Sequence, residues 1–302
     1  MLLWDFFVWV GALAILYYLG KWAIRTFSKI NIESYKDGWV MITGSTAGIG
    51  KEFAKEFSRR NFKVLLIARN EKKINEIIRE IKKENPAAVV EYLVADFKYS
   101  HRDPENFYRT LISSLANYEI SILVNNIGVA HFKFLPEQSL DDIEEMLGVN
   151  IYPQTMISYH LLPKLFQRYK RENKRSLIMN ICAIMDIMIT PTASIYSATK
   201  IYNAYLSEIL RYENSEFIDV ATIKPGPVMT DLVVNNHGEN FPMMISAESF
   251  VSSSLKSLHK GIQYGHWKHA VFAKFFEVVP YQIMIFFVQK LIPIAKKYNL
   301  IQ

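Results

Sequence analysis

The stretch Thr43-Gly44-Ser45-Thr46-Ala47-Gly48-Ile49-Gly50 decides the fold of this chain, because of the segments that flank it. A short apolar run, residues 39–42, precedes it, and apolar residues recur at helical spacing in residues 51–57 behind it. A glycine turn between a strand and a helix is the setting in which such a loop binds the pyrophosphate of a dinucleotide. The amide groups that open the helix would then face the anion.

We expect each of the three glycines of this loop to have a different structural role. We expect Gly44 to permit the tight turn, Gly48 to let the backbone approach a phosphate, and Gly50 to let the helix pack close to the strand. The spacing alone is a weak signal, because any glycine-rich turn between a strand and a helix could show it. The other predicted cofactor contacts of the loop lie between the glycines: Ser45, Thr46 and Ile49.

Length and composition narrow the class of protein. With 302 residues the chain could form one large α/β domain or two ordinary ones. The single cysteine, Cys182, excludes an intrachain disulfide and fits a reducing compartment. The net charge is +6 at pH 7, but the basic residues are scattered among acidic ones, so we expect no nucleic-acid partner. The seven histidines are dispersed as well, and we expect no metal site.

The N-terminus differs in kind from the rest of the chain. Residues 2–24 carry only two charges, and about 20 apolar residues are enough to cross a bilayer. A cleaved signal peptide and a buried helix are the alternatives. A signal peptide carries its positive charge before the apolar run, whereas Lys21, Arg25 and Lys29 come at its end and behind it. We therefore predict that residues 1–30 are an uncleaved transmembrane anchor whose C-terminal side faces the cytosol.

Behind a polar linker, predicted strands and helices alternate along the chain. The strands are apolar throughout, and such strands, each followed by a helix, indicate a parallel sheet covered on both faces. We therefore expect an α/β fold, a doubly wound parallel sheet of the Rossmann type, over residues 31–270. After the first strand, the predicted strands are residues 63–68, 89–94, 120–124, 176–181 and 219–223. After the first helix, the predicted helices are residues 71–84, 105–115, 140–150, 155–169 and 195–212.

Candidate cofactor contacts follow three of these strands, at the edge where a doubly wound sheet binds its ligand. Arg69 follows the second strand, where an acid would bind the ribose of NAD, and its guanidinium suits the 2′-phosphate of NADP instead. An ordinary solvated arginine is the alternative. Asp96 follows the third strand and is either an acceptor for the adenine amine or a turn residue. Asn125-Asn126-Ile127-Gly128 ends the fourth strand, with amides that can hold the backbone and a glycine that allows close approach.

The predicted reacting groups lie four residues apart on one helix. Tyr196 and Lys200 therefore share a helix face. A tyrosine of ordinary pKa, about 10, is a poor proton donor and a worse base at neutral pH. We expect the Lys200 ammonium to favour the phenolate, to lower the pKa of Tyr196 and to donate to ribose hydroxyls. A Tyr-x3-Lys pair alone is common on helices, but here the glycine loop and residues 125–128 precede it.

Together these motifs resemble the short-chain dehydrogenase/reductase family in order and spacing, over about residues 38–270. The resemblance implies that Tyr196 is the acid/base, that Lys200 tunes it and that Asn150 holds a proton-relay water. Thr230 would contact the nicotinamide amide or the pyrophosphate. The same motif supplies three further predicted cofactor contacts: Pro225, Gly226 and Val228. The matching motifs are Thr43-Gly44-x3-Gly48-Ile49-Gly50, Asn125-Asn126-x-Gly128, Asn150, Tyr196-Ser197-Ala198-Thr199-Lys200 and Pro225-Gly226-x-Val228-x-Thr230.

The N-terminal anchor, the Tyr-Ser-Ala-Thr-Lys motif and the long C-terminal tail are similar to one branch of this family. That branch contains 17β-hydroxysteroid dehydrogenases and very-long-chain 3-oxoacyl-CoA reductases of the endoplasmic reticulum. The resemblance implies an NADP(H)-dependent oxidoreductase of the endoplasmic-reticulum membrane, with its catalytic domain in the cytosol. The substrate would be an apolar ketone or alcohol, either a fatty acyl-CoA or a steroid, and the motifs do not separate the two. A homodimer is compatible with the sequence, which does not fix the oligomeric state.

One position departs from the family pattern. The family has a serine thirteen residues before the tyrosine, where it hydrogen-bonds the substrate carbonyl, and this chain has Ala183. Cys182 is adjacent, but a thiol is a weak donor, and neighbouring strand residues point to opposite faces. Ser194 and Ser197 flank the tyrosine and are the other candidates. The substitution keeps a second function open, that of a catalytically impaired, membrane-tethered scaffold that binds the cofactor.

Two apolar stretches near the C-terminus complete the prediction. Residues 231–245 match the position of the family's substrate lid, so the resemblance implies a loop that covers the substrate. Their apolar, methionine-containing character suits a lipid-like ligand. Core packing is the alternative for its apolar residues. Residues 271–302 are apolar but interrupted by charges and prolines, which favours an interfacial or pocket-covering segment over a clean membrane span. The apolar residues of the predicted covering loop are Phe241, Met243 and Met244.

Overall fold

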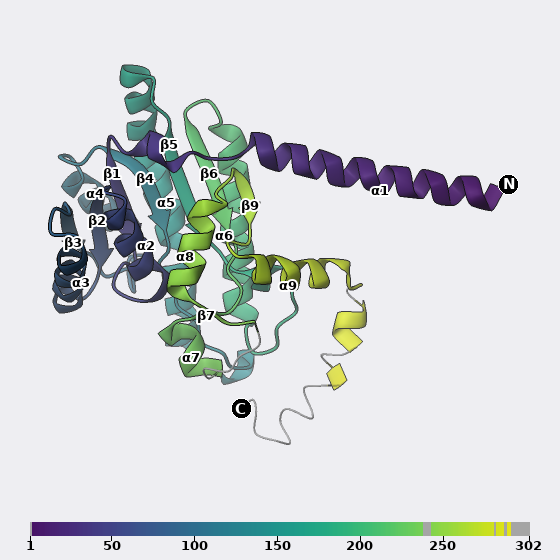
Figure 1. Ribbon diagram of the computed structural model, residues 1–302. Helices are drawn as coiled ribbons and strands as arrows, with labels where there is room; N and C mark the ends of the chain where they lie inside the picture. Colours follow the sequence, from purple (N-terminus) through teal and green to yellow (C-terminus); the bar gives the residue numbers. More distant parts are fainter. Residues whose placement is uncertain (1, 238–242, 281, 287–288, 291–302) are drawn as a thin grey trace.

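The computed structural model describes residues 2–237, 243–280, 282–286 and 289–290, and a parallel sheet lies at its centre (Figure 1). The sheet has the strand order β3-β2-β1-β4-β5-β6-β9, and every neighbouring pair is parallel. The order reverses between β1 and β4, which confirms the predicted doubly wound fold. The strands are β1 (Trp39–Thr43), β2 (Lys63–Ala68), β3 (Val90–Val94), β4 (Ile120–Asn125), β5 (Ser176–Ile181), β6 (Ile218–Ile223) and β9 (Gly261–Gln263).

Helices cover both faces of the sheet, because successive strand residues point to opposite sides. Val40 and Ile42 of β1 belong to the core with Phe53 of α2, whereas Met41 belongs to the core on the other face with Ile157 of α5. The first core lies under α2 (Gly48–Arg59), α3 (Glu71–Glu84) and α8 (Ala247–Lys256). The second lies under α4 (Pro104–Ser114) and α5 (Leu140–Glu172), and α6 (Ser194–Glu213) packs beside α5.

Residues 140–169 form one helix, α5, rather than the two that the sequence predicts. Pro153 and Pro163 lie inside it, and a proline in a helix interior normally kinks or breaks the helix. Here Pro153 is buried, and the neighbouring Gln154 is buried against α6, where its side-chain amide donates to the carbonyl oxygen of Asn203 (2.9 Å). Packing against α6 therefore outweighs the local preference for a break.

The predicted continuous loop over residues 231–245 is wrong for the described part of the stretch. It begins with α7 (Asp231–His237) and ends in β8 (Ile245–Ser246), which pairs with β7 (Val228–Met229). Val228 and Ile245 are buried, so the short strand pair removes apolar side chains from water. Phe241, a predicted covering residue, lies outside the described residues.

The N-terminal helix α1 (Leu2–Phe27) leaves the domain beside the edge strand β9 (Figure 1). Its root is fixed by backbone hydrogen bonds, from Ile30 N–H to the carbonyl oxygen of Leu258 (3.0 Å) and from Lys260 N–H to that of Ser28 (2.8 Å). The sequence predicts a membrane-spanning helix here. Across the residues that the structure describes, no helix is both long enough and apolar enough to cross a membrane.

Helix α9 (Trp267–Val278) follows β9 after three residues. The predicted domain boundary at residue 270 falls within this helix. Residues 282–286 are helical as well, and residues 291–302 lie outside the described part of the chain.

Candidate active site

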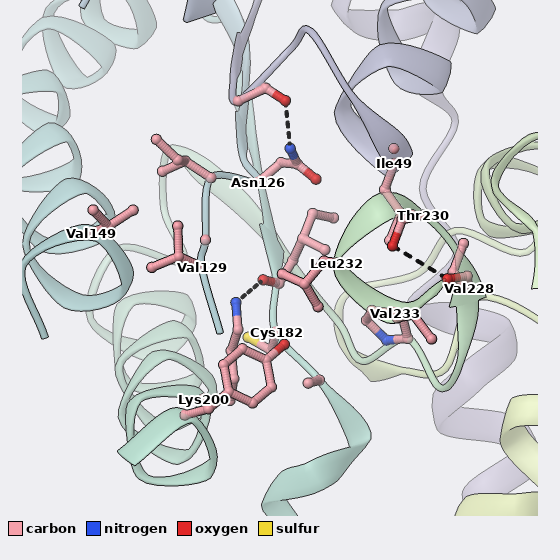
Figure 2. A pocket seen from close by; sticks show the side chains of 18 of the residues that line it. Ile49, Asn126, Val129, Val149, Cys182, Lys200, Val228, Thr230, Leu232 and Val233 are labelled. Carbon is pink, nitrogen blue, oxygen red and sulfur yellow. Dashed lines mark hydrogen bonds between the residues drawn. The ribbon is translucent and has the colours of Figure 1, made fainter. Parts of the chain in front are cut away.

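A cavity of about 660 Å³ at the carboxyl ends of the strands brings most of the predicted site residues together (Figure 2). A doubly wound sheet binds its ligands at this edge, and the volume is typical of a small-molecule site. The predicted residues that line it are Gly44, Thr46, Gly48, Ile49, Arg69, Asp96, Asn126, Gly128, Tyr196, Lys200, Pro225, Gly226, Val228 and Thr230. The predicted residues outside its lining are Ser45, Gly50, Asn125 and Asn150.

The glycine loop has the backbone shape that the sequence predicts. Gly44 and Gly48 have φ angles of +65° and +51°, a region that favours glycine, and Gly48 opens α2 toward the cavity. A Cβ atom on Gly50 would lie 2.3 Å from the carbonyl oxygen of Gly44 and 2.4 Å from the side-chain nitrogen of Asn126. At Gly50 the helix therefore packs closely against Gly44 of the turn and the side chain of Asn126. Ser45 is buried, and its hydroxyl donates to a backbone carbonyl of β2 (3.4 Å) instead of facing the cavity.

Side-chain amides fix the strand ends behind the cavity. Asn126 donates to the carbonyl oxygen of Thr43 (2.9 Å), so it holds the glycine turn against β4. Asn125 donates to the side-chain oxygen of Asn180 (2.8 Å), and Asn180 donates in turn to the hydroxyl of Ser207 on α6 (2.8 Å). Asn125 therefore ties β4 to β5 and α6, and sequence reasoning missed Asn180 and Ser207 because nothing local marks them.

Tyr196 and Lys200 lie together in the wall of the cavity, 8% and 4% exposed. The Lys200 Nζ lies 5.6 Å from the centroid of the Tyr196 ring and donates to the carbonyl oxygen of Ile181 (3.3 Å; Figure 2). Gly128 leaves room for this ammonium, since a Cβ atom there would lie 3.2 Å from Nζ. The Tyr196 ring also packs against Phe132, with centroids 5.8 Å apart.

The pKa of Tyr196 is shifted in the direction opposite to the one that the sequence predicts. Burial raises the pKa of Tyr196 above its ordinary value and lowers the pKa of Lys200. The predicted lowering of the Tyr196 pKa is therefore wrong for this structure, because loss of water around the phenol dominates. The phenol is therefore protonated at neutral pH, and the raised pKa makes it a weaker acid than an ordinary tyrosine.

Asn150 lies inside α5, is 1% exposed and uses its side chain to hold the loop after β4. Its Oδ1 accepts from the N–H of Val129 (2.8 Å), and its Nδ2 donates to the carbonyl oxygen of Val129 (2.9 Å) and to the hydroxyl of Thr199 (3.0 Å). Its own carbonyl oxygen accepts from the side chain of Asn203 (2.9 Å). Asn150 thus positions the wall of the cavity relative to α6, and its role in holding a water stays a prediction.

Arg69 and Asp96 lie at the end of the cavity formed by the loops after β2 and β3. Arg69 is exposed at the rim, directly after Ala68, the last residue of β2. Asp96 accepts from the backbone N–H of Lys98 (3.0 Å), so it has the turn role that was one of its two alternatives. It also lines the cavity, and its contact with an adenine stays a prediction.

Ala183 follows β5 and lines the cavity in one cluster with Tyr196 and Met146. It is 5% exposed, and its φ of −159° is ordinary extended backbone. The structure therefore places no hydroxyl where the family has its serine. Cys182 lies beside it (Figure 2), and burial raises the pKa of its thiol to about 12, so the thiol stays protonated.

Neither serine that flanks the tyrosine reaches the cavity. Ser194 is exposed outside its lining, and the hydroxyl of Ser197 is buried outside it. Two threonines that sequence reasoning missed do line it, Thr190 and Thr192. Thr192 has a φ of +69°, which is unusual for a β-branched residue. The signal available in the sequence was the turn-forming Thr-Pro-Thr stretch just before α6.

The end of the cavity beyond Tyr196 is apolar. Predicted covering residues Met243 and Met244 are half-buried outside the lining, because this part of the chain leads into β8. Leu232 and Val233 of α7 line the cavity instead (Figure 2). The other apolar residues at this end come from the loops after β4 and β5 and from α9: Phe132, Met185, Met188 and Phe272.

Helix α9 is held against the wall of the cavity by His269. This residue is fully buried, and its Nε2–H donates to the carbonyl oxygen of Pro227 (3.1 Å). A Cβ atom on Gly226 would lie 2.7 Å from the imidazole ring, so the glycine allows this contact. Burial lowers the pKa of His269 to about 4, which keeps the ring neutral at physiological pH.

The fold and this arrangement define the class of protein. A family model described as short chain dehydrogenase matches residues 38–240, and the chain belongs to this family of oxidoreductases. The predicted resemblance to the family and to its hydroxysteroid and 3-oxoacyl-CoA branch is confirmed.

Three known proteins illustrate the similarity. The very-long-chain 3-oxoacyl-CoA reductase of Homo sapiens is 31% identical over 294 residues, which cover 91% of this chain and 89% of that protein. Hydroxysteroid dehydrogenase-like protein 1 of Gallus gallus is 30% identical over 282 residues, or 90% of this chain and 81% of that protein. Among solved structures, a short-chain dehydrogenase from Sphingobium yanoikuyae in complex with NADPH shares the fold, with a TM-score of 0.66 and 22% identity over 81% of this chain and 97% of that one.

Proposed function

We propose that the protein is an NADP(H)-dependent oxidoreductase that interconverts a ketone and a secondary alcohol on a lipid-like substrate, either a 3-oxoacyl-CoA or a ketosteroid. The observation that carries the proposal is a single cavity with a glycine loop and Arg69 at one end, Tyr196 and Lys200 in its wall and apolar residues at the other end. The names of the two relatives, a 3-oxoacyl-CoA reductase and a hydroxysteroid dehydrogenase-like protein, point to the same two substrate classes.

The end of the cavity at the glycine loop suits nicotinamide adenine dinucleotide phosphate. The positive φ angles of Gly44 and Gly48 turn the backbone so that the N-terminus of α2 opens toward the cavity, where it would hold the pyrophosphate. Arg69 would bind the 2′-phosphate, for which a guanidinium is a planar, charged partner. When bound, the cofactor supplies the hydride that the substrate carbon accepts.

The residues of the chain provide the proton and the setting for that transfer. Tyr196, which is protonated at neutral pH, would donate its proton to the carbonyl oxygen, while Lys200 would hold the ribose beside it. The apolar end of the cavity would orient the chain or ring system of the substrate and exclude water. Because Ala183 offers no hydroxyl, the carbonyl oxygen has Tyr196 as its one assigned donor, and the enzyme is expected to be slow.

A screen of NADPH oxidation tests the proposed function. The full chain in detergent micelles would be mixed with NADPH and with ketosteroids or 3-oxoacyl-CoAs of increasing length, with absorbance at 340 nm as the readout. We expect kcat/KM to rise with chain length, since each buried methylene adds about 0.8 kcal/mol of binding until the cavity is full. Equal kcat/KM for short and long chains would contradict a lipid-like substrate.

Changing Arg69 to Asp should reverse the cofactor preference. A charge-assisted hydrogen bond to the 2′-phosphate contributes about 1.5–3 kcal/mol, so the affinity for NADPH should fall about 10- to 100-fold while that for NADH does not. Fluorescence titration of each cofactor measures this. The matched control is Arg79→Asp, which places the same charge on the exposed surface of α3 outside the cavity. Tighter binding of NADH than NADPH to the native protein would show that the 2′-phosphate site is misplaced.

A scaffold is the second candidate function, and the absence of a hydroxyl at Ala183 is the observation that favours it. Such a protein would bind NADPH and a membrane but would reduce ketones slowly or not at all. Tyr196, Lys200 and Asn150 favour the enzyme, because a scaffold has no chemical need for all three.

We also propose that α1 holds the protein on the endoplasmic-reticulum membrane, with the domain in the cytosol where NADPH is supplied. Trp4, Phe7 and Trp9 support this, since they are 74%, 66% and 69% exposed and have no protein core to enter. The basic residues next to the apolar run, Lys21, Arg25 and Lys29, lie on its domain side, which favours a cytosolic domain.

A further inference from the structure

The outer face of α9 presents a row of exposed apolar side chains. Trp267, Val271, Phe275 and Val278 are 66%, 56%, 64% and 80% exposed. Their spacing of four, four and three residues places them on one side of the helix. Single exposed apolar residues are ordinary on a protein surface, but a contiguous row of this size marks a surface with a partner.

The inner face of the same helix belongs to the candidate active site. His269 and Ala273 are fully buried, and Phe272 lines the cavity. Helix α9 is therefore apolar on both sides and forms a wall one helix thick between the cavity and the surroundings. A helix of this kind is normally enclosed on both sides by apolar material.

The position of α9 connects this surface with the N-terminal helix. Helix α9 follows β9, and the residues just before β9 bond the root of α1, through Ile30 to Leu258 and Lys260 to Ser28. An antiparallel bridge between Lys29 and His259 completes the connection. Figure 1 shows both helices projecting from the domain on the side of β9. Two exposed apolar helices thus leave the fold from one edge of the sheet.

The charges on α9 suit a lipid surface. The helix carries two lysines, Lys268 and Lys274, and one acid, Glu277, which forms an ion pair with Lys274; Lys29 lies at the root of α1. Aromatic and aliphatic side chains flanked by lysines bind the headgroup region of bilayers that contain anionic lipids.

We propose that the outer face of α9, formed by Trp267, Val271, Phe275 and Val278, lies in the surface of a lipid bilayer, and that substrate passes from that bilayer into the cavity beside Phe272. The substrate path rests on the proposed function, whereas the contact of α9 with lipid does not.

The lipid contact is tested by a fluorescent label on the full chain. The native cysteine, Cys182, is 2% exposed, so a cysteine introduced by Phe275→Cys takes a nitrobenzoxadiazole maleimide selectively. The labelled protein would be placed in vesicles of phosphatidylcholine and phosphatidylserine, with and without doxyl-labelled lipid as quencher. The matched control is Tyr205→Cys on α6, where the native side chain is similarly exposed at 71%.

We expect the doxyl lipid to quench the label at position 275 and not the label at position 205. Equal quenching at both positions, or none at either, would overturn the lipid contact. A signal at position 275 that depends on protein concentration and ignores the quencher would overturn it as well, because the partner would then be a second copy of the chain. This readout needs no catalysis, so it stands even if no ketone is reduced.

The substrate path is tested by placing a negative charge on the outer face of α9. Phe275→Glu should lower kcat/KM about tenfold for a long ketone dissolved in the vesicles and leave it unchanged for a short water-soluble ketone, a shift of about 1.4 kcal/mol. Tyr205→Glu, the control, should change neither. Equal loss on both ketones would overturn the path, because the variant would then have damaged the site itself.

Discussion

Phenylalanine in place of Tyr196 should lower kcat for ketone reduction about 10²- to 10⁴-fold, the contribution that a positioned general acid makes. NADPH binding should be retained, because the ring that packs against Phe132 (centroids 5.8 Å apart) and lies 5.6 Å from the Lys200 ammonium is still present. Single-turnover oxidation of NADPH measures the loss, and fluorescence titration of NADPH shows that the site is intact.

The matched control is Tyr202→Phe on the same helix. The Tyr202 hydroxyl hydrogen-bonds to that of Thr155 (3.0 Å), and the residue lies outside the lining of the cavity. The variant loses one partly exposed hydrogen bond, worth about 0.5–1.5 kcal/mol of stability, and should keep its kcat. A Tyr196→Phe protein that reduces ketones at the native rate would show that the proton comes from another group.

The direction of the Tyr196 pKa adds a pH dependence to this result. Burial raises the pKa of the phenol, so the protonated donor is the main form at every pH below that raised value. The rate of reduction should therefore stay level as pH rises through neutrality and should fall only when pH approaches the raised pKa. A rate that already falls between about pH 6 and 8, well below the ordinary tyrosine value of about 10, would mean either that Tyr196 ionises more easily than its burial implies or that Lys200, whose pKa burial lowers, loses its proton there.

Most of the sheet could be predicted from the sequence because its five central strands are almost entirely buried on both faces. A strand such as residues 63–68 is then apolar along almost its whole length, and its ends are visible as the charged residues Lys63 and Arg69. The glycine loop was equally visible, since Gly44 and Gly48 adopt φ angles that glycine favours. These features depend on neighbours in the sequence.

Features that depend on residues far apart in the chain could not be predicted. The roles of Asn125 and Asn150 are set by partners at positions 180, 129 and 199, which no local pattern connects. The continuity of α5 through Pro153 depends on α6, and the raised pKa of Tyr196 depends on how completely other segments exclude water. Sequence spacing placed Tyr196 and Lys200 on one helix face, but it carried no information about that burial.

The other large effect is expected from Ala183→Ser, which should raise kcat about 10²- to 10³-fold. Reduction builds negative charge on the carbonyl oxygen, and one preorganised donor aimed at such an oxygen contributes about 2.7–4 kcal/mol. Residue 183 faces the cavity beside Tyr196, has an extended φ and precedes a short helix, Ile184–Asp186, as its N-cap. Serine is a preferred N-cap residue, so the fold should tolerate the substitution. NADPH affinity should stay unchanged, because the new hydroxyl would face the substrate.

The control for this prediction is Cys182→Ser, which replaces a thiol of the same cavity lining by a hydroxyl one residue earlier. Neighbouring residues in extended backbone point to opposite sides, so this variant should give no comparable gain. If the native protein and Ala183→Ser are both inert toward a broad panel of ketones while NADPH still binds, the protein is a scaffold. If the native protein is already fast and the new serine adds nothing, another donor serves the carbonyl oxygen. The structure then directs the search to the hydroxyls of Thr190 and Thr192, which line the cavity, and away from Ser194, which does not. Thr192→Val would remove one of these hydroxyls while keeping the branched side chain. If Thr192 is that donor, kcat of the variant should fall by two to three orders of magnitude, and adding Ala183→Ser to the variant should restore it.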